Sequence, residues 1–231
     1  MSTTGVSVSF SVIKARKAQA CLAKKVISED RNPKTIRFVA GVDAAYARDL
    51  AFGATAVLDY DSLEVLETQT AMRQVTFPYV ATLLSFRELP VVAACIRKLK
   101  VQPDVLLVDG HGRAHPLGCG LASHLGVALG KPTVGVAKSR LIGEQMKIGE
   151  DSFLTYDGEV LAAVVQAVKG SKPIYVSIGH MVSLETAVKI VRHCIHGFRV
   201  PERIRVAHLL ACKERKAKIA DQSNMIRRML C

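Results

Sequence analysis

Two aspartates lie at positions of the sequence where a carboxylate is unusual, in or at the end of an apolar run. Asp43 interrupts the apolar, β-branched stretch TIRFVAGVDAAYA, and Asp109 ends the short apolar run VLLVD, directly before a segment rich in glycine and histidine. Burying an unpaired carboxylate is costly, so Asp43 needs a cation, a hydrogen-bond network or a proton. Asp109 ends a predicted buried strand, and the carboxyl ends of such strands are where α/β sheets bind ligands.

A third acid, Glu88, lies beside a proline. Because Pro90 pushes the preceding Leu89 away from helical geometry, the sequence predicts a junction between two helices, with Pro90 in the first turn of the second. At a junction the carboxylate of Glu88 can point inward. If the fold brings the three acids together, they suit Mg²⁺, which takes oxygen ligands, bridges to substrate phosphates and supports phosphodiester hydrolysis. Taken one at a time, each acid could equally be a hydrogen-bonded polar residue.

The elements that must position these acids follow from the hydrophobic pattern. Three apolar, β-branched stretches with short polar connections predict an antiparallel three-stranded meander over residues 35–47, 53–60 and 63–75. Apolar periodicity predicts, in addition, helices over 11–28, 77–89, 90–100, 120–130 and 183–195 and strands over 103–109 and 132–138. Ser183 can cap the last of these helices. We therefore expect an α/β fold with a mixed sheet, in a single domain over residues 1–231.

The charge of the chain points to a partner. Lysine and arginine outnumber aspartate and glutamate by 32 to 20, which gives a formal net charge of +12. Such an excess favours a polyanion, most often nucleic acid, with a merely basic protein as the alternative. Basic residues are dense near the start and again from about residue 213, where the chain could be an ordered helix end or a flexible arm that binds nucleic acid.

The sequence also argues against several classes of protein. No apolar run approaches the roughly 18 residues that a membrane span needs, and the first ten residues lack the pattern of a signal peptide. The six cysteines include no C-x-x-C pair, so neither a zinc site nor a disulfide framework is indicated. We expect a cytoplasmic monomer without a membrane partner.

Six segments of the chain resemble the endonuclease V family, whose members are deoxyinosine-specific repair nucleases. They occur in order and are AGVDAAY (40–46), FPYV (77–80), FRELP (86–90), VDGHGRAHPLGCGLASHLGV (108–127), PTVGVAKSRL (132–141) and VSIGHMVSLETAV (176–188). The resemblance covers nearly the whole chain. It implies a ribonuclease H-like fold, in which carboxylates gather at the centre of a mixed sheet.

For the chemistry, the resemblance implies roles for five side chains. Asp43 and Asp109 are metal ligands and Glu88 completes the acidic cluster, with Mg²⁺ as the expected ion and Mn²⁺ as a substitute. Lys138 matches the catalytic lysine, whose ammonium could stabilise charge on the phosphate or orient water. His208 matches a histidine near the metal centre on the last helix, although by itself it could be an ordinary helix residue.

For substrate binding, the resemblance implies a wedge and a pocket. Tyr79, after the turn-stiffening Pro78, matches the aromatic side chain that fills the space left by a flipped base. His115 lies in the loop that resembles the lesion pocket, where it either contacts a phosphate or braces the loop. Four glycines could let the backbone approach a flipped hypoxanthine closely, because they have no side chain: Gly110, Gly112, Gly118 and Gly120.

The activity that the resemblance implies is hydrolysis of the second phosphodiester bond on the 3′ side of a deoxyinosine in DNA. Two alternatives remain open. The chain could act mainly on inosine in RNA, reading the same base, or it could bind nucleic acid without cutting it. Two departures from the family pattern bear on affinity and substrate range: residues 117–119 include no basic residue, and Met181 stands where arginine is common.

Overall fold

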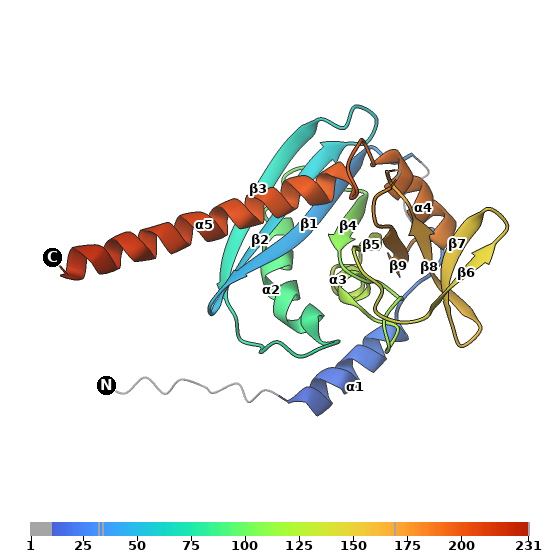
Figure 1. Cartoon of the computed structure of the whole chain (residues 1–231), viewed down its shortest axis with the longest axis horizontal. Coiled ribbons are helices and arrows are strands. Elements are labelled where there is room, and N and C mark those ends of the chain that lie inside the picture. Colours follow the sequence, from blue (N-terminus) through green and yellow to red (C-terminus); the bar gives the residue numbers. More distant parts are fainter. Residues whose placement is uncertain (1–10, 32, 34, 169, 231) are drawn as a thin grey trace.

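The structure, a computed structural model, describes residues 11–31, 33, 35–168 and 170–230, with side chains described up to residue 221. These residues form a nine-stranded sheet with helices on both faces (Figure 1). The strands are β1 (Phe38–Ala47), β2 (Leu50–Asp59), β3 (Val65–Gln74), β4 (Val105–Asp109), β5 (Thr133–Ala137), β6 (Glu144–Ile148), β7 (Asp151–Tyr156), β8 (Glu159–Val165) and β9 (Ile174–His180). The helices are α1 (Val12–Ala23), α2 (Leu84–Ile96), α3 (Leu121–Leu129), α4 (Leu184–His193) and α5 (Glu202–Leu230).

The strand order is β3-β2-β1-β4-β5-β9-β8-β7-β6. The first three strands pair antiparallel, which confirms the predicted meander. At the centre, β1, β4 and β5 run parallel, and the strands beyond β5 pair antiparallel. The predicted mixed α/β sheet is therefore confirmed, and its parallel centre brings the carboxyl end of β4 beside the middle of β1.

One predicted break is absent. Helix α2 runs without interruption from Leu84 to Ile96 with Pro90 inside it, so the junction expected before Pro90 was wrong, and Glu88 lies within a helix. A proline inside a helix removes one hydrogen bond and crowds the carbonyl of the residue four positions earlier. The apolar face around Val91 and Val92, however, packs against the sheet in a buried cluster. Burial of that face outweighs the lost hydrogen bond. The segment 77–83, predicted as helix, is an irregular connection instead.

The second half of the sheet was not predicted from the pattern. Strands β6, β7 and β8 form a meander that joins the centre through β9. Every residue of β6 is exposed, so this strand carries no alternation of buried and exposed positions that could reveal it. The first helix is also shorter than predicted, because it ends at Ala23 and not at residue 28.

Buried apolar clusters lie on the two faces of the sheet. Helices α2 and α3 cover one face, and α4 and the start of α5 cover the other. Helix α5 crosses β1 and β2 and continues past β3 (Figure 1). Its close approach depends on Gly41, because a Cβ there would lie 2.2 Å from the carbonyl of Arg203. This approach places the following turn of α5 over the carboxyl ends of the central strands.

Candidate active site

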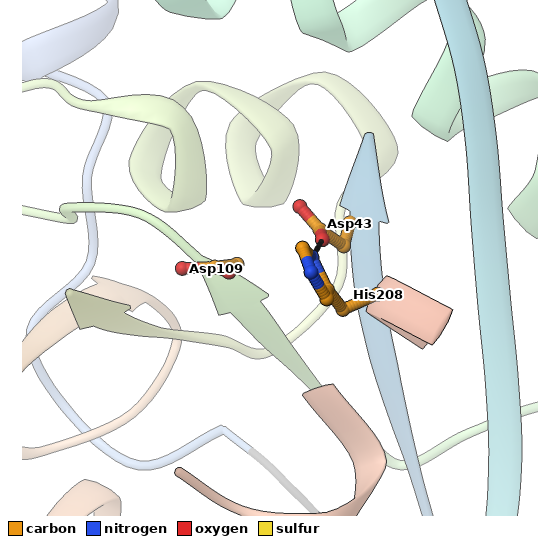
Figure 2. Close-up of side chains that lie close together, drawn as sticks. All are labelled: Asp43, Asp109 and His208. Carbon is orange, nitrogen blue, oxygen red and sulfur yellow. Dashed lines mark hydrogen bonds and ion pairs between the residues drawn. The ribbon is translucent and has the colours of Figure 1, made fainter. Parts of the chain in front are cut away.

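The two aspartates predicted as metal ligands lie side by side on neighbouring parallel strands. Val42 of β1 is in register with Val108 of β4, so Asp43 and Asp109 each follow at the next position. His208 of α5 completes the group, and one ligand atom from each of these three side chains lies within 4.8 Å of the others (Figure 2). Residues that are distant in sequence therefore meet where the carboxyl end of β4 lies beside the middle of β1.

The electrostatics of Asp43 show that this group is unfavourable by itself. Burial raises the pKa of Asp43, and the negative charge of Asp109 raises it further. Two contacts oppose the shift: Nδ1 of His208 lies 2.7 Å from the Asp43 carboxylate, and the N–H of Ala44 donates to it at 2.7 Å. Two crowded carboxylates with oxygen ligands directed to one place suit a hard divalent cation, which would relieve their repulsion.

Glu88 lies close to this pair but outside the group of three. Burial raises the pKa of Glu88 to about 8, and the charges of Asp43 and Asp109 contribute to the rise. Its carboxyl group, held by α2, faces the pocket that Asp109 also lines. Glu88 is thus within electrostatic reach of the aspartates, but its oxygens do not share their 4.8 Å group.

Lys138 places a positively charged side chain at the site. It directly follows β5, the strand next to β4, and its ammonium forms an ion pair with the carboxylate of Asp109. About 40% of the Lys138 side chain is exposed, against 15% for Asp109. A partly exposed ammonium on the flexible lysine stem can contact an incoming phosphate while it remains near the aspartate.

A pocket of about 300 Å³ opens beside Asp109, which is within the range of ligand-binding cavities. Its lining includes Glu88, Asp109, Gly110, His115 and Gly120, together with Tyr79, Val80, Ala81, Thr82, Leu84, Ser85, His111, Leu121, Ser139 and Leu141. Tyr79 stands at this pocket with 73% of its surface exposed, and the adjacent Pro78 is also exposed. The structure thus joins the carboxylate pair, the candidate wedge and the glycine-rich loop in one continuous site.

The glycines of this loop differ in what a side chain at each position would contact. A Cβ at Gly112 would lie 2.0 Å from the carbonyl oxygen of Ile178, and one at Gly120 would lie 2.3 Å from that of His111. At Gly110 a Cβ would meet only the side chain of Leu121, at 3.4 Å. Gly112 is therefore required by the protein's own packing, whereas Gly110 borders the pocket with space to spare.

His115 has its ring nitrogens directed at backbone groups. Its Nδ1 accepts from the N–H of Leu117 at 3.2 Å, and its Nε2 lies 3.0 Å from the carbonyl oxygen of Thr82. The first contact leaves the proton on Nε2, which then donates to Thr82. Burial lowers the pKa of His115 to about 4, so the ring is neutral at pH 7. Of the two roles left open by the sequence, these contacts favour bracing the loop.

Sequence analysis did not single out two further side chains at the site. His111 lines the pocket next to Gly110, and its Nδ1 is buried without a hydrogen-bond partner in the described part of the chain. Cys212 lies one turn after His208, with its Sγ 3.7 Å from Nε2 of His208. For Cys212, the available signal in the sequence was its position four residues after His208, which is expected on the last helix.

Known proteins resemble this chain over most of its length. A family model described as Endonuclease V matches residues 20–209. A relative from Thermofilum pendens named Endonuclease V is 49% identical over 205 residues, which cover 87% of this chain and 88% of that protein. The crystal structure of Endonuclease V from Streptomyces avermitilis superposes with a TM-score of 0.86 at 36% identity, covering 91% of this chain and 96% of that one.

One of the similar structures contains nucleic acid. Endonuclease V from Ciona intestinalis, in complex with a 24-mer DNA containing an inosine followed by a ribo-adenosine, has a TM-score of 0.80 at 32% identity. The match covers 89% of this chain and 98% of that chain.

Proposed function

The chain belongs to the endonuclease V family, and from this premise we propose that it is a metal-dependent endonuclease that recognises deoxyinosine in DNA and hydrolyses the second phosphodiester bond 3′ to it. Family membership makes the protein a nuclease; the lesion, the metal and the cleavage position are the proposal. The main observation behind this proposal is that the Asp43–Asp109 pair directly adjoins a pocket lined by residues of the glycine-rich loop. A nuclease that must recognise a base and cut nearby needs these two parts as neighbours.

The acidic residues fit the metal that the family implies. Asp43 and Asp109 offer carboxylate oxygens at one place. Burial raises the pKa of Asp43, and the charge of Asp109 raises it further, a repulsion that a bound cation would remove. Glu88 lies outside the group formed by Asp43, Asp109 and His208, and it could contact such an ion through a water ligand. Mg²⁺ bound there, or Mn²⁺ in its place, would lower the pKa of a water and stabilise charge on the phosphate oxygens.

The surrounding side chains have distinct tasks in this proposal. His208 holds the Asp43 carboxylate in one orientation through its Nδ1 contact. Lys138, now paired with Asp109, can turn its ammonium toward the negative charge that develops on the phosphate. Neither residue has to move far, because each already contacts one of the two aspartates.

The pocket would receive the flipped base. Hypoxanthine carries a 6-oxo group where adenine has an amine, and peptide N–H and C=O groups of the loop after Asp109 can distinguish the two. Tyr79 is exposed in the free protein, as an aromatic that stacks against an opened base pair must be. A deaminated, mispaired base costs less to flip than a well-paired one, which adds selectivity.

Inosine in RNA is the second candidate substrate. The bound oligonucleotide of the Ciona intestinalis relative contains an inosine followed by a ribo-adenosine, so that relative accommodates a 2′-hydroxyl next to the lesion. The same pocket would read the same base in either strand type, and contacts to the 2′-hydroxyl would set the preference. A third candidate, a binding protein that does not cut, lacks support because the two aspartates and Lys138 are all in place.

The test is a nicking assay with the wild type and Asp43→Asn, which keeps the shape of the side chain and removes its charge. Duplexes with one deoxyinosine or one adenine at the same position are compared in Mg²⁺, with the matched inosine RNA in parallel. We expect a Mg²⁺-dependent nick at the second phosphodiester 3′ to deoxyinosine and a loss of at least about 10²-fold in the variant. Cleavage of RNA alone would assign the enzyme to RNA, and tight binding without any nick would overturn the proposal.

A further inference from the structure

A second pair of potential metal ligands lies on the outer side of His208. The Sγ atom of Cys212 is 3.7 Å from Nε2 of His208, because residues four apart on a helix are neighbours on its surface. About half of the His208 side chain is exposed and Cys212 is half-buried. An ion from solvent can therefore reach both atoms.

The Nδ1 atom of His208 contacts a carboxylate, as the non-ligating nitrogen of a metal-binding histidine usually does. Nδ1 lies 2.7 Å from the carboxylate of Asp43, which favours the proton on Nδ1 and leaves Nε2 as an acceptor for the Cys212 thiol. Histidine ligands usually donate their second N–H to a carboxylate in this way, which orients the ring and increases its basicity. Here the acceptor lone pair belongs to the nitrogen next to the Cys212 sulfur.

The separation of the two atoms also matches a tetrahedral ion. Zn²⁺ binds thiolate sulfur at about 2.3 Å and imidazole nitrogen at about 2.0–2.1 Å, so at a tetrahedral angle the two ligands are about 3.6 Å apart. The observed distance is 3.7 Å. We propose that Cys212 and His208 form a second metal site, for a thiophilic divalent cation such as Zn²⁺ or Cd²⁺.

The two sites differ in the ions that they select. Asp43 and Asp109 offer only oxygen, which suits Mg²⁺, whereas a thiolate with an imidazole prefers softer ions. When the ion binds, the Cys212 thiol releases its proton to solvent and a metal–sulfur bond forms, with water in the remaining positions. The ion also immobilises His208 and adds positive charge beside the aspartates, which opposes a second cation there. Zn²⁺ or Cd²⁺ at Cys212 therefore inhibits the nuclease; this consequence, unlike the binding, rests on the proposed function.

Binding is tested on the full-length protein without nucleic acid, by titrating Cd²⁺ and following the ultraviolet charge-transfer absorption of the cadmium–thiolate bond. Cys212→Ser removes the sulfur ligand, and Cys21→Ser removes an exposed thiol on α1 as the matched control. We expect saturable absorption in the wild type and in Cys21→Ser, and an affinity at least about tenfold weaker in Cys212→Ser. Unchanged absorption in Cys212→Ser, or its loss in Cys21→Ser, would overturn the site.

Inhibition is tested by adding Zn²⁺ to nicking reactions that contain excess Mg²⁺, with each variant compared with its own rate without Zn²⁺. The half-inhibitory Zn²⁺ concentration should rise at least about tenfold in Cys212→Ser and stay unchanged in Cys21→Ser. Equal sensitivity of all three proteins would refute the inhibitory role. If no protein nicks deoxyinosine DNA at all, the proposed function fails while the cadmium titration still decides the metal site.

Discussion

At the scale of single residues, the site stores electrostatic repulsion in three acids. Burial raises the pKa of both Asp43 and Glu88, and the negative charge of neighbouring acids adds to each rise. Such an arrangement destabilises the metal-free protein and at the same time increases its affinity for a cation. The same residues that would bind metal therefore make the stability of the apoprotein depend on pH.

Glu88 makes this dependence measurable. Burial raises the pKa of Glu88 from its ordinary value of 4.5 to about 8, so between these pH values the folded protein retains a proton that the unfolded chain has lost. The unfolding free energy of metal-free protein should thus fall as pH rises from about 5 to about 8, by up to about 1.4 kcal/mol per pH unit. Urea unfolding in a chelator at several pH values measures this slope.

Glu88→Gln should flatten that slope, because a glutamine carries no titrating proton. The matched control is Glu150→Gln, which changes an exposed glutamate in the β6–β7 turn and should keep the wild-type slope. Equal slopes in all three proteins would show that Glu88 ionises normally and that its burial beside Asp43 and Asp109 is relieved in solution.

At the scale of elements, the loop between β4 and α3 combines packing with the recognition role proposed for it. The N–H of Gly112 donates to Oγ of Ser177 at 2.9 Å, and the N–H of Arg113 donates to the carbonyl of Ile178 at 2.7 Å. These bonds fasten the loop to β9, which was not predicted from the sequence. A strand remote from the acids thus determines where the pocket wall lies.

Two glycine substitutions separate these roles. In Gly112→Ala the new methyl would lie 2.0 Å from the backbone oxygen of Ile178, so the loop or β9 must shift, and we expect a loss of at least about 2 kcal/mol in unfolding free energy. In Gly110→Ala the methyl meets only the side chain of Leu121, at 3.4 Å, so stability should change little. The methyl borders the pocket, however, and should weaken binding of deoxyinosine DNA.

Chemical denaturation and a binding titration on both variants check this prediction. A stable Gly112→Ala protein would show that the contact with Ile178 is looser in solution. Wild-type affinity in Gly110→Ala would place the flipped base away from this part of the loop.

At the scale of the whole molecule, α5 connects the site to the surface of the protein. It carries His208 over the aspartates, and Lys213 and Lys216 further along it are exposed. The helix then continues past β3 (Figure 1). The family model ends at residue 209, so this part of α5 lies beyond the matched region. The basic segment predicted from residue 213 is helical to Leu230, which is the ordered alternative of the two left open by the sequence. The structure also contains no helix, among the described residues, that is long and apolar enough to cross a membrane.

The double substitution Lys213→Ala/Lys216→Ala tests whether this extension contacts nucleic acid. Each lost phosphate contact should reduce the slope of log affinity against log salt by about one, for lesion-containing and undamaged duplexes alike. Lys131→Ala/Lys147→Ala, which removes two lysines from another part of the surface, controls for net charge. Unchanged slopes in the first variant would mean that α5 ends in solvent beside the bound substrate.

The sequence alone determined those features that depend on local pattern. Three apolar, β-branched runs with short polar connections predicted the first three strands. The apolar run before Asp109 predicted a buried central strand with an acid at its carboxyl end. Both aspartates could be selected in this way, because an acid in or at the end of an apolar strand is anomalous without reference to any partner. The net charge also follows from the sequence alone, without knowledge of the fold.

Only the tertiary structure decided which side chains meet. Pro90 breaks helices in isolation, yet burial of the apolar face of α2 keeps the helix continuous and places Glu88 inside it. Asp43 and His208 are 165 positions apart, and they meet because Gly41 allows α5 to approach β1 closely. Such contacts arise from packing between distant elements, which local propensity does not encode. The spacing of His208 and Cys212 on one helix is local, but their position beside Asp43 is visible only in the folded chain.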